Sequence, residues 1–300
     1  MTLAVEDVDG VVSIRSEGEL LARYRAETAA SKPGFDVLAL PAGTNAPGEN
    51  LVVWAPHDHS WHLGAFYCPK LVDGLNCWES EPHEGAGKRH GYATNEGYDA
   101  RGDGDAVTLE QSAAWRRSDD ESVLLDDERA ITVHEPDAGG YVLDWTQTLT
   151  ARGASRNLSS ETLHGHYSGL SLRFARSLTD GRVLLPNGTD VGTTTPPRDV
   201  SGPAGRWCDY SGLLDGRTGP GESWSAGVAM FDHPENAADP VRWFVMTEPF
   251  GFLAANPTWG DVLTLAAGES VTWNWGLWVH DGTPKEAEIE AVYEDYVTRN

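Results

Sequence analysis

The residues with the clearest chemical potential lie in one short segment, Pro56-His57-Asp58-His59-Ser60-Trp61-His62-Leu63-Gly64. Three histidines fall within six residues, and an aspartate separates the first two. An imidazole can ligate a metal ion or transfer a proton near neutral pH, and a neighbouring aspartate can fix its tautomer. The spacing predicts a divalent-metal site built from His57, His59 and His62, a metal-free acid–base site, or a purely structural cluster.

A second polar segment follows, at Val72-Asp73-Gly74-Leu75-Asn76-Cys77-Trp78-Glu79. Its Val-Asp-Gly start is typical of a turn before a short strand. Asn76, Trp78 and Glu79 could then contact a substrate, because an indole face stacks well on the apolar face of a sugar ring. His90 ends the Gly-rich loop that comes next and is a further candidate for contact with a hydroxylated or anionic ligand.

The remaining candidates are scattered along the chain. Asp209 and His233 are predicted to complete a catalytic group with His59 and His62. Further predicted substrate contacts are Trp61, Trp207, Tyr210 and Asn256. His164 and His166 flank a glycine before an alternating strand, and Arg173 within that strand is expected to lie on an exposed face.

The elements that must position these residues are mostly strands. Apolar and polar residues alternate around 141–146, 170–175 and 272–279, which is the period of half-buried strands. Helix is predicted only near the C-terminus, at 283–299, where Thr283 can cap the first turn and Pro284 suits its start. Residues 17–27 fit a helix or a strand. We therefore expect an all-β protein, a large antiparallel β-sandwich with a C-terminal helix.

Turn residues are spread along the chain, so one domain over residues 1–300 is expected, with 283–299 as its helix. The predicted long loops are residues 79–104 and 185–206, both polar and rich in glycine or proline. Loops of this length in compact domains are often functional.

Composition excludes several classes. The 22 basic and 46 acidic residues give a net charge of −24, which disfavours binding to nucleic acid. No apolar run approaches the roughly 18 residues of a membrane span, and no signal peptide is recognised. Three cysteines in 300 residues do not make a disulfide framework. We expect a soluble, cytoplasmic protein, and a homo-oligomer stays open. Nucleotide-binding and serine-hydrolase motifs are missing from the sequence.

These segments together resemble the DUF6807 family, often labelled the "methane oxygenase PmoA family", and within it a branch with the pattern D-H-x-W-H. The resemblance rests on residues 58–62, 72–78, 207–212, 229–234 and 250–257 and on His90. Many members carry a Lys-Glu-Gly element where His166, Tyr167 and Ser168 stand, so no catalytic Lys/Glu pair is carried over. The resemblance implies a sandwich similar to galactose mutarotase and a place in sugar catabolism.

The sequence hypothesis is therefore a carbohydrate-active enzyme with a His-rich site. It would act on a keto-glycoside by elimination or hydrolysis, or on an aldose by epimerisation, because these reactions need a positioned acid or base. One alternative is a non-catalytic carbohydrate-binding or regulatory module. Another is a metal-dependent, cupin-like oxygenase or isomerase. A small-molecule carbohydrate is the expected partner, with no nucleic acid and no membrane.

Overall fold

The computed structural model of the protein describes residues 2–26, 32–79, 89–137, 139–160, 166–186, 189–190, 202–219 and 222–299. These residues form antiparallel strands and one C-terminal helix, which confirms the predicted all-β sandwich. The helix α1 spans Glu286–Arg299. Its first turn begins just after Thr283 and Pro284, as the capping pattern indicates.

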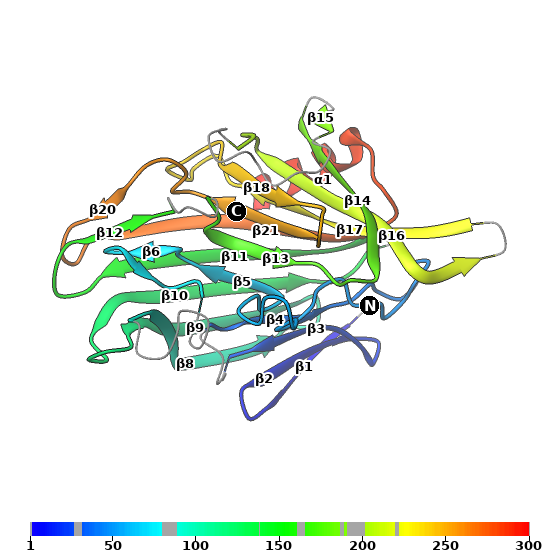
Figure 1. The fold of residues 1–300 in the computed structure, drawn as a ribbon. Helices are drawn as coiled ribbons and strands as arrows, with labels where there is room; N and C mark the ends of the chain where they lie inside the picture. The colour runs from blue at the N-terminus through cyan, green and yellow to red at the C-terminus, as the bar shows by residue number, and fades with distance from the viewer. Residues whose placement is uncertain are drawn as a thin grey trace.

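Two large sheets make up most of the fold (Figure 1). The eight-stranded sheet contains, in spatial order, β1 (Leu3–Val8), β2 (Val11–Ser16), β3 (Glu19–Arg25), β4 (Gly34–Leu38), β5 (Ala65–Cys68), β13 (Gly169–Arg173), β19 (Phe252–Asn256) and β18 (Arg242–Met246). The nine-stranded sheet contains β15 (Thr189–Asp190), β14 (Leu178–Leu185), β16 (Trp207–Gly219), β17 (Glu222–Asp232), β21 (Ser270–Asp281), β11 (Gly140–Ala151), β10 (Val123–His134), β9 (Ala106–Arg117) and β8 (Gly91–Gly102).

A small sheet joins segments that are distant in sequence, in the order β20 (Leu263–Leu265), β12 (Arg156–Ser159), β6 (Leu71–Val72) and β7 (Leu75–Asn76). The turn between β6 and β7 is the predicted one, with Asp73 and Gly74 at positive φ. Because this hairpin is short, it returns the chain directly from Lys70 to Cys77, whose N–H donates to the Lys70 carbonyl at 3.0 Å.

The main core lies between the inner faces of the two large sheets. Tyr67 of β5 packs against Trp273 and Trp275 of β21, with ring centroids 6.2 and 5.8 Å apart. The alternation around 272–279 predicted this arrangement, since both tryptophans point inward and are buried. Phe66, the residue before Tyr67 in β5, therefore points to the outer face of the eight-stranded sheet.

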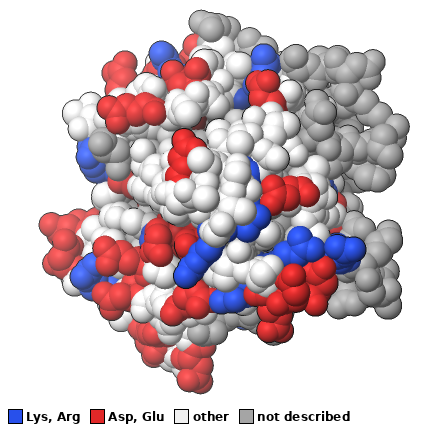
Figure 2. Space-filling model, turned by 90° about the vertical axis from the view of Figure 1, so that its left-hand side faces the viewer, with Lys and Arg blue, Asp and Glu red and all other residues white. Residues whose placement is uncertain are grey.

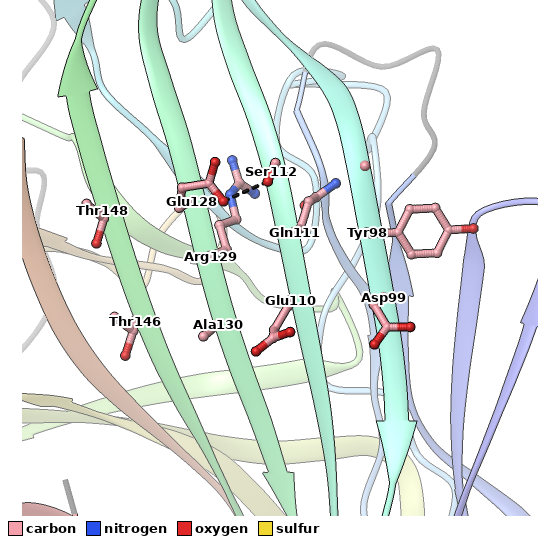
Figure 3. A pocket seen from close by; sticks show the side chains of 11 residues that line it. Tyr98, Asp99, Glu110, Gln111, Ser112, Glu128, Arg129, Ala130, Thr146 and Thr148 are labelled. Atoms are coloured by element: carbon pink, nitrogen blue, oxygen red, sulfur yellow. Dashed lines mark hydrogen bonds between the residues drawn. The ribbon is translucent and has the colours of Figure 1, made fainter. Parts of the chain in front are cut away.

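The outer face of the nine-stranded sheet has two different parts. The helix α1 covers one part, where its Ile289, Tyr293 and Tyr296 pack in a second apolar cluster with Trp207 and Trp278. The other part, over β8 to β11, is uncovered and carries a shallow groove of about 450 Å³ (Figure 3). Its lining side chains are mainly hydroxyls and carboxylates, for example Thr146, Thr148, Glu110 and Glu128.

Two segments that were predicted as a possible helix or a loop contain strands instead. Residues 17–27 contain β3, so the helical alternative is wrong. The predicted loop 79–104 contains the long strand β8 over its second half, because that stretch pairs with β9 from Gly91↔Arg117 to Gly102↔Val107. Residues 80–88 lie outside the described part, as do 187–188 and 191–201 of the other predicted loop.

The N-terminal strand β1 is the edge of the eight-stranded sheet and pairs with β2 alone in that sheet. Its start touches the other large sheet, because Leu3 N donates to Gly104 O at 2.8 Å, just beyond β8. The apolar side chain of Leu3 is buried, whereas Glu6 and Asp7 are exposed. β1 thus spans one open side of the sandwich with an acidic outer surface.

Charged residues of both signs share the surface seen in Figure 2, and acidic ones predominate there. On the described part of that face, acidic side chains lie beside the basic ones, which agrees with the net charge of −24. Among the described residues, no helix is both long and apolar enough to cross a membrane.

Candidate functional site

The His-rich segment forms two successive turns over the eight-stranded sheet, not the extended strand that would align His57 with His59. His59 N donates to Pro56 O at 3.1 Å, and His62 N donates to His59 O at 2.9 Å. This geometry stacks the His59 and His62 rings, with centroids 4.9 Å apart and an interplanar angle of 26°. His57 is exposed at the first turn. Two of the three predicted histidines therefore come together.

Gly64 anchors these turns to the sheet. Its φ is 68°, and a Cβ there would lie 2.0 Å from the carbonyl oxygen of Phe35 in β4. Only glycine fits such a close approach in this conformation. Its carbonyl in turn accepts a 2.8 Å hydrogen bond from Arg173 N, so the His-rich turns and β13 are held in register.

Arg173 is the central cation of the site, and the expectation that it is exposed is wrong. Its side chain is fully buried and its guanidinium lies 3.6 Å from the centroid of Phe250. Nη2 donates to Asp58 Oδ2 at 2.7 Å and Nη1 lies 3.3 Å from His62 Nδ1. Because a guanidinium can only donate, His62 Nδ1 is the acceptor and His62 carries its proton on Nε2.

The electrostatics keep both imidazoles neutral and Asp58 ionised. Burial would raise the pKa of the Asp58 carboxyl, but the hydrogen bond and charge of Arg173 outweigh it and hold that pKa well below its usual range. Burial lowers the pKa of His59, with Asp58 opposing the shift, and burial next to His59 and Arg173 lowers the pKa of His62 strongly. At neutral pH both rings are therefore bases without a charge.

His59 is the accessible member of this group. Its Nδ1 lies 3.4 Å from Asp58 Oδ2, and about a third of its side chain (34%) is exposed. Its ring edge also meets Trp61, 4.9 Å away between centroids. A neutral imidazole thus lies near the surface beside the Asp58 carboxylate and a partly exposed aromatic ring, an arrangement suited to a general base.

The buried side chain of Trp78 lies between this histidine pair and a second polar group. Trp78 lies 6.2 Å from His62 and 4.9 Å from Tyr167, between ring centroids. Trp78 is fully buried, so the prediction that its face stacks on a sugar is wrong. Gly91 allows the close packing of this segment, since a Cβ there would lie 2.3 Å from Cys77 Sγ.

The second polar group contains an ion pair that the sequence analysis missed. Lys70 Nζ donates to Glu79 Oε2 at 2.5 Å and to the Tyr167 hydroxyl at 3.2 Å. Glu79 also accepts from Tyr167 at 2.9 Å and from Asn76 Nδ2 at 2.6 Å. Burial would raise the pKa of Glu79, but the charge and hydrogen bond of Lys70 hold it below its ordinary value. Asn76 and Glu79 were predicted here; Lys70 and Tyr167 were not.

Lys32 completes the surroundings of Trp78. Its side chain is fully buried, and Nζ donates to the Trp78 carbonyl at 2.6 Å. The ammonium lies 5.5 Å from the centroid of Phe66 and 6.0 Å from that of Trp78. Burial lowers the pKa of Lys32, since its charge is taken out of water.

The predicted metal ligands do not converge. In the described part of the chain, no three or more His, Cys, Asp or Glu side chains are placed to hold a metal ion. The His59 and His62 rings are stacked, so their nitrogen lone pairs lie in nearly parallel planes and do not point at a common position between them. The Arg173 guanidinium also occupies the Nδ1 side of His62. The ligand set of His57, His59 and His62 is therefore not assembled.

The other two predicted catalytic residues lie on a different face of the molecule. Asp209 and Trp207 share one face of β16, the outer face covered by α1, where Asp209 Oδ1 pairs with His280 Nε2 at 2.8 Å. His233 contacts Tyr296 of α1, 5.8 Å away between centroids. The structure therefore separates Asp209 and His233 from His59 by the thickness of the sandwich, and the predicted single site is divided.

Trp207 and Tyr210 are packing residues. Trp207 is fully buried under α1 and donates through Nε1 to Glu290 at 2.8 Å. Tyr210 points inward and stacks on Phe174 with centroids 4.1 Å apart. Neither ring offers a face to a ligand, which corrects their prediction as substrate contacts.

Asn256 and His90 lie beside the segments that carry the site. Asn256 is buried and donates to Ser160 Oγ at 2.9 Å and to the His166 carbonyl. It therefore positions the chain just before Tyr167. His90 is held by Ser118, whose Oγ accepts from His90 N at 3.0 Å. His164 lies outside the described residues.

The fold and site define an antiparallel β-sandwich with a polar, aromatic-lined site on the outer face of its eight-stranded sheet. Residues 11–294 match the family described as "Family of unknown function (DUF6807)", so the chain belongs to that family, as its motifs predict. No curated protein matches it.

Among solved structures, the chain is similar to a TPR-domain containing protein from Parabacteroides distasonis, with a TM-score of 0.46 and 11% identity. The similarity covers 92% of this chain and 48% of that chain, so this chain spans about half of that protein's length.

Proposed function

We propose that the protein is a carbohydrate-active enzyme whose His59 moves a proton on a bound sugar. The observation that carries the proposal is the Asp58–His59 pair: a neutral, partly exposed imidazole beside a carboxylate and Trp61. A general base must be unprotonated and within reach of its substrate. His62 cannot take this role through Nδ1, because Arg173 already donates to that nitrogen.

The Lys70–Glu79–Tyr167 group would supply the second proton-transferring partner. Glu79 is mostly buried, with 15% of its side chain exposed, and accepts hydrogen bonds from both other members. Trp78 separates this group from the histidine pair. Elimination of a keto-glycoside needs a base that removes the proton beside the carbonyl and an acid that protonates the leaving oxygen. Epimerisation of an aldose likewise needs one base and one acid.

A sugar is the proposed substrate because the site combines hydrogen-bonding groups with aromatic surface. Trp61 is partly exposed and its indole can pack on the C–H face of a pyranose. Asn76 and Glu79 add an amide and a carboxylate suited to hydroxyl groups. This pairing of one aromatic platform with several polar groups is common in small-molecule sites.

The test follows two signals by NMR over a panel of aldoses, keto-glycosides and plain glycosides. One is exchange of sugar C–H hydrogens with deuterated water, and the other is the rate of anomer equilibration, which exchanges no C–H hydrogen. Replacing His59 by Gln should lower exchange or turnover by about 10²–10⁴-fold, the usual contribution of a general base, while binding persists. His57→Gln is the matched control, since His57 is exposed on the same turn, and it should leave the rate unchanged.

Two results would change the proposal. Sugar binding in a thermal-shift panel without exchange or turnover would favour the non-catalytic binding module. A melting-temperature increase caused by a divalent metal, reversed by a chelator and lost in His59→Gln, would favour the metal-dependent alternative. Binding of no sugar at all would overturn the carbohydrate assignment.

A further inference from the structure

Buried hydrogen-bond donors exceed acceptors around Trp78. The Lys32 ammonium has three N–H donors, and its one hydrogen-bond acceptor among the described residues is the Trp78 carbonyl. Within the same described part, Trp78 Nε1 and Arg173 Nε are buried with no hydrogen-bond partner. Both of these side chains are fully buried. Buried donors without acceptors are costly, so a ligand that brings acceptors would be stabilised here.

The two carboxylates of the site lie beside other cations. Asp58 Oδ2 accepts from Arg173 Nη2. Asp58 Oδ1 lies 3.3 Å from Arg176 Nη2 but, among the described residues, accepts no hydrogen bond. Both Glu79 oxygens accept hydrogen bonds within the Lys70 group. Among the described residues, both carboxylates pair with other cations and none forms an ion pair with Lys32.

The distribution of charge points the same way. The chain has only four lysines, and two of them, Lys32 and Lys70, are buried at this site. Among the described residues, Arg173 and Arg176 bring the cationic side chains to four, against the two carboxylates of Asp58 and Glu79. In a chain of net charge −24 this local excess of positive charge is the reverse of the general composition. Its field would attract and retain an anion.

We propose that the substrate is an acidic sugar whose carboxylate or phosphate group binds beside Lys32 and Arg173. This inference rests on the proposed function, because it names the substrate class of the same site. Charge-assisted hydrogen bonds from an ammonium and a guanidinium to such a group are short and about twice as strong as neutral ones. The anion would offset the cost of burying Lys32 and supply the missing acceptors.

The test compares sugars with and without an anionic group, by isothermal titration calorimetry at constant ionic strength. Glucuronate is paired with glucuronamide, and glucose 6-phosphate with glucose, so that the two arms separate a carboxylate from a phosphate. At least one acid should bind about tenfold or more tightly than its neutral partner. Lys32→Met should reduce this preference to about twofold, whereas Lys285→Met, at an exposed position, should retain it.

The outcomes are distinct. If neutral sugars bind as tightly as both acids, the acidic-sugar inference fails and the carbohydrate proposal stands. If no sugar of either kind binds, both fail. If Lys32→Met folds and keeps the full preference, Lys32 is not the anion-binding residue and the inference is overturned. If that variant does not fold, the comparison of glucuronate with glucuronamide on the natural chain still decides whether the site selects an anion.

Discussion

At the scale of single residues, Arg173 determines the chemistry of the site because it fixes both neighbours. It keeps Asp58 ionised, and it leaves His62 with its proton on Nε2. Sequence analysis identified the histidines, since three of them stand close together in the chain. It could not identify their partner, because Arg173 is more than a hundred residues away in sequence, at a separation of 115 from Asp58.

Replacing Asp58 by Asn should destabilise the protein by about 2 kcal/mol, because it leaves the buried Arg173 cation without its counter-ion. We place the cost below the value for a fully buried pair since 23% of the Asp58 side chain is exposed. Urea denaturation measures the loss. Arg176→Gln is the control: this side chain is 57% exposed, and its loss should change stability by about 0.5 kcal/mol or less.

The same pair predicts a pH dependence. The folded-state pKa of Asp58 is lowered, so its contribution to stability is present above the unfolded carboxyl pKa of about 4 and is lost as pH falls below it. Melting temperatures between pH 7 and pH 3 should therefore fall less steeply in Asp58→Asn than in the natural chain. Equal slopes would show that this carboxylate is not responsible for acid sensitivity.

At the scale of elements, local sequence patterns predicted several strands and the helix, but they did not predict which elements pack against one another. Alternation predicted the strands around Leu143 and Trp275, and the cap at Thr283 predicted α1. Alternation gives two faces to each strand, but it does not say which face meets which neighbour. For this reason Asp209 and His233 were assigned to the His59 site, although they lie under α1. The Lys70–Glu79 ion pair, which spans a short hairpin, was missed for the same reason.

The docking of α1 can be tested by removing one buried side chain. Ile289 is fully buried against the nine-stranded sheet, so Ile289→Ala should cost about 2–5 kcal/mol through lost burial and the cavity it leaves. Thermal or chemical denaturation reports this loss. Glu294→Ala, at an exposed position of the same helix, should change stability little. A similar small effect for both variants would mean that α1 contributes little to the fold.

At the scale of the whole molecule, the net charge of −24 should make stability depend on salt. Like charges repel in the compact state, and ions screen this repulsion over about 10 Å at 0.1 M ionic strength. We expect the melting temperature to rise as sodium chloride increases from about 0.02 to 0.5 M. A falling melting temperature would instead indicate that attractive pairs, such as Arg152 with Asp126, dominate the surface.

The acidic edge strand β1 has a consequence for self-association. An unpaired strand edge is a template to which another chain can add, and charged side chains on that edge discourage such pairing. Glu6 and Asp7 occupy this position, next to the apolar residues Val5 and Val8. Protonation or removal of these two carboxylates would remove the charge that discourages pairing of β1 with the β1 of a second molecule. The acidity of this chain therefore also protects it against growing into an extended intermolecular sheet.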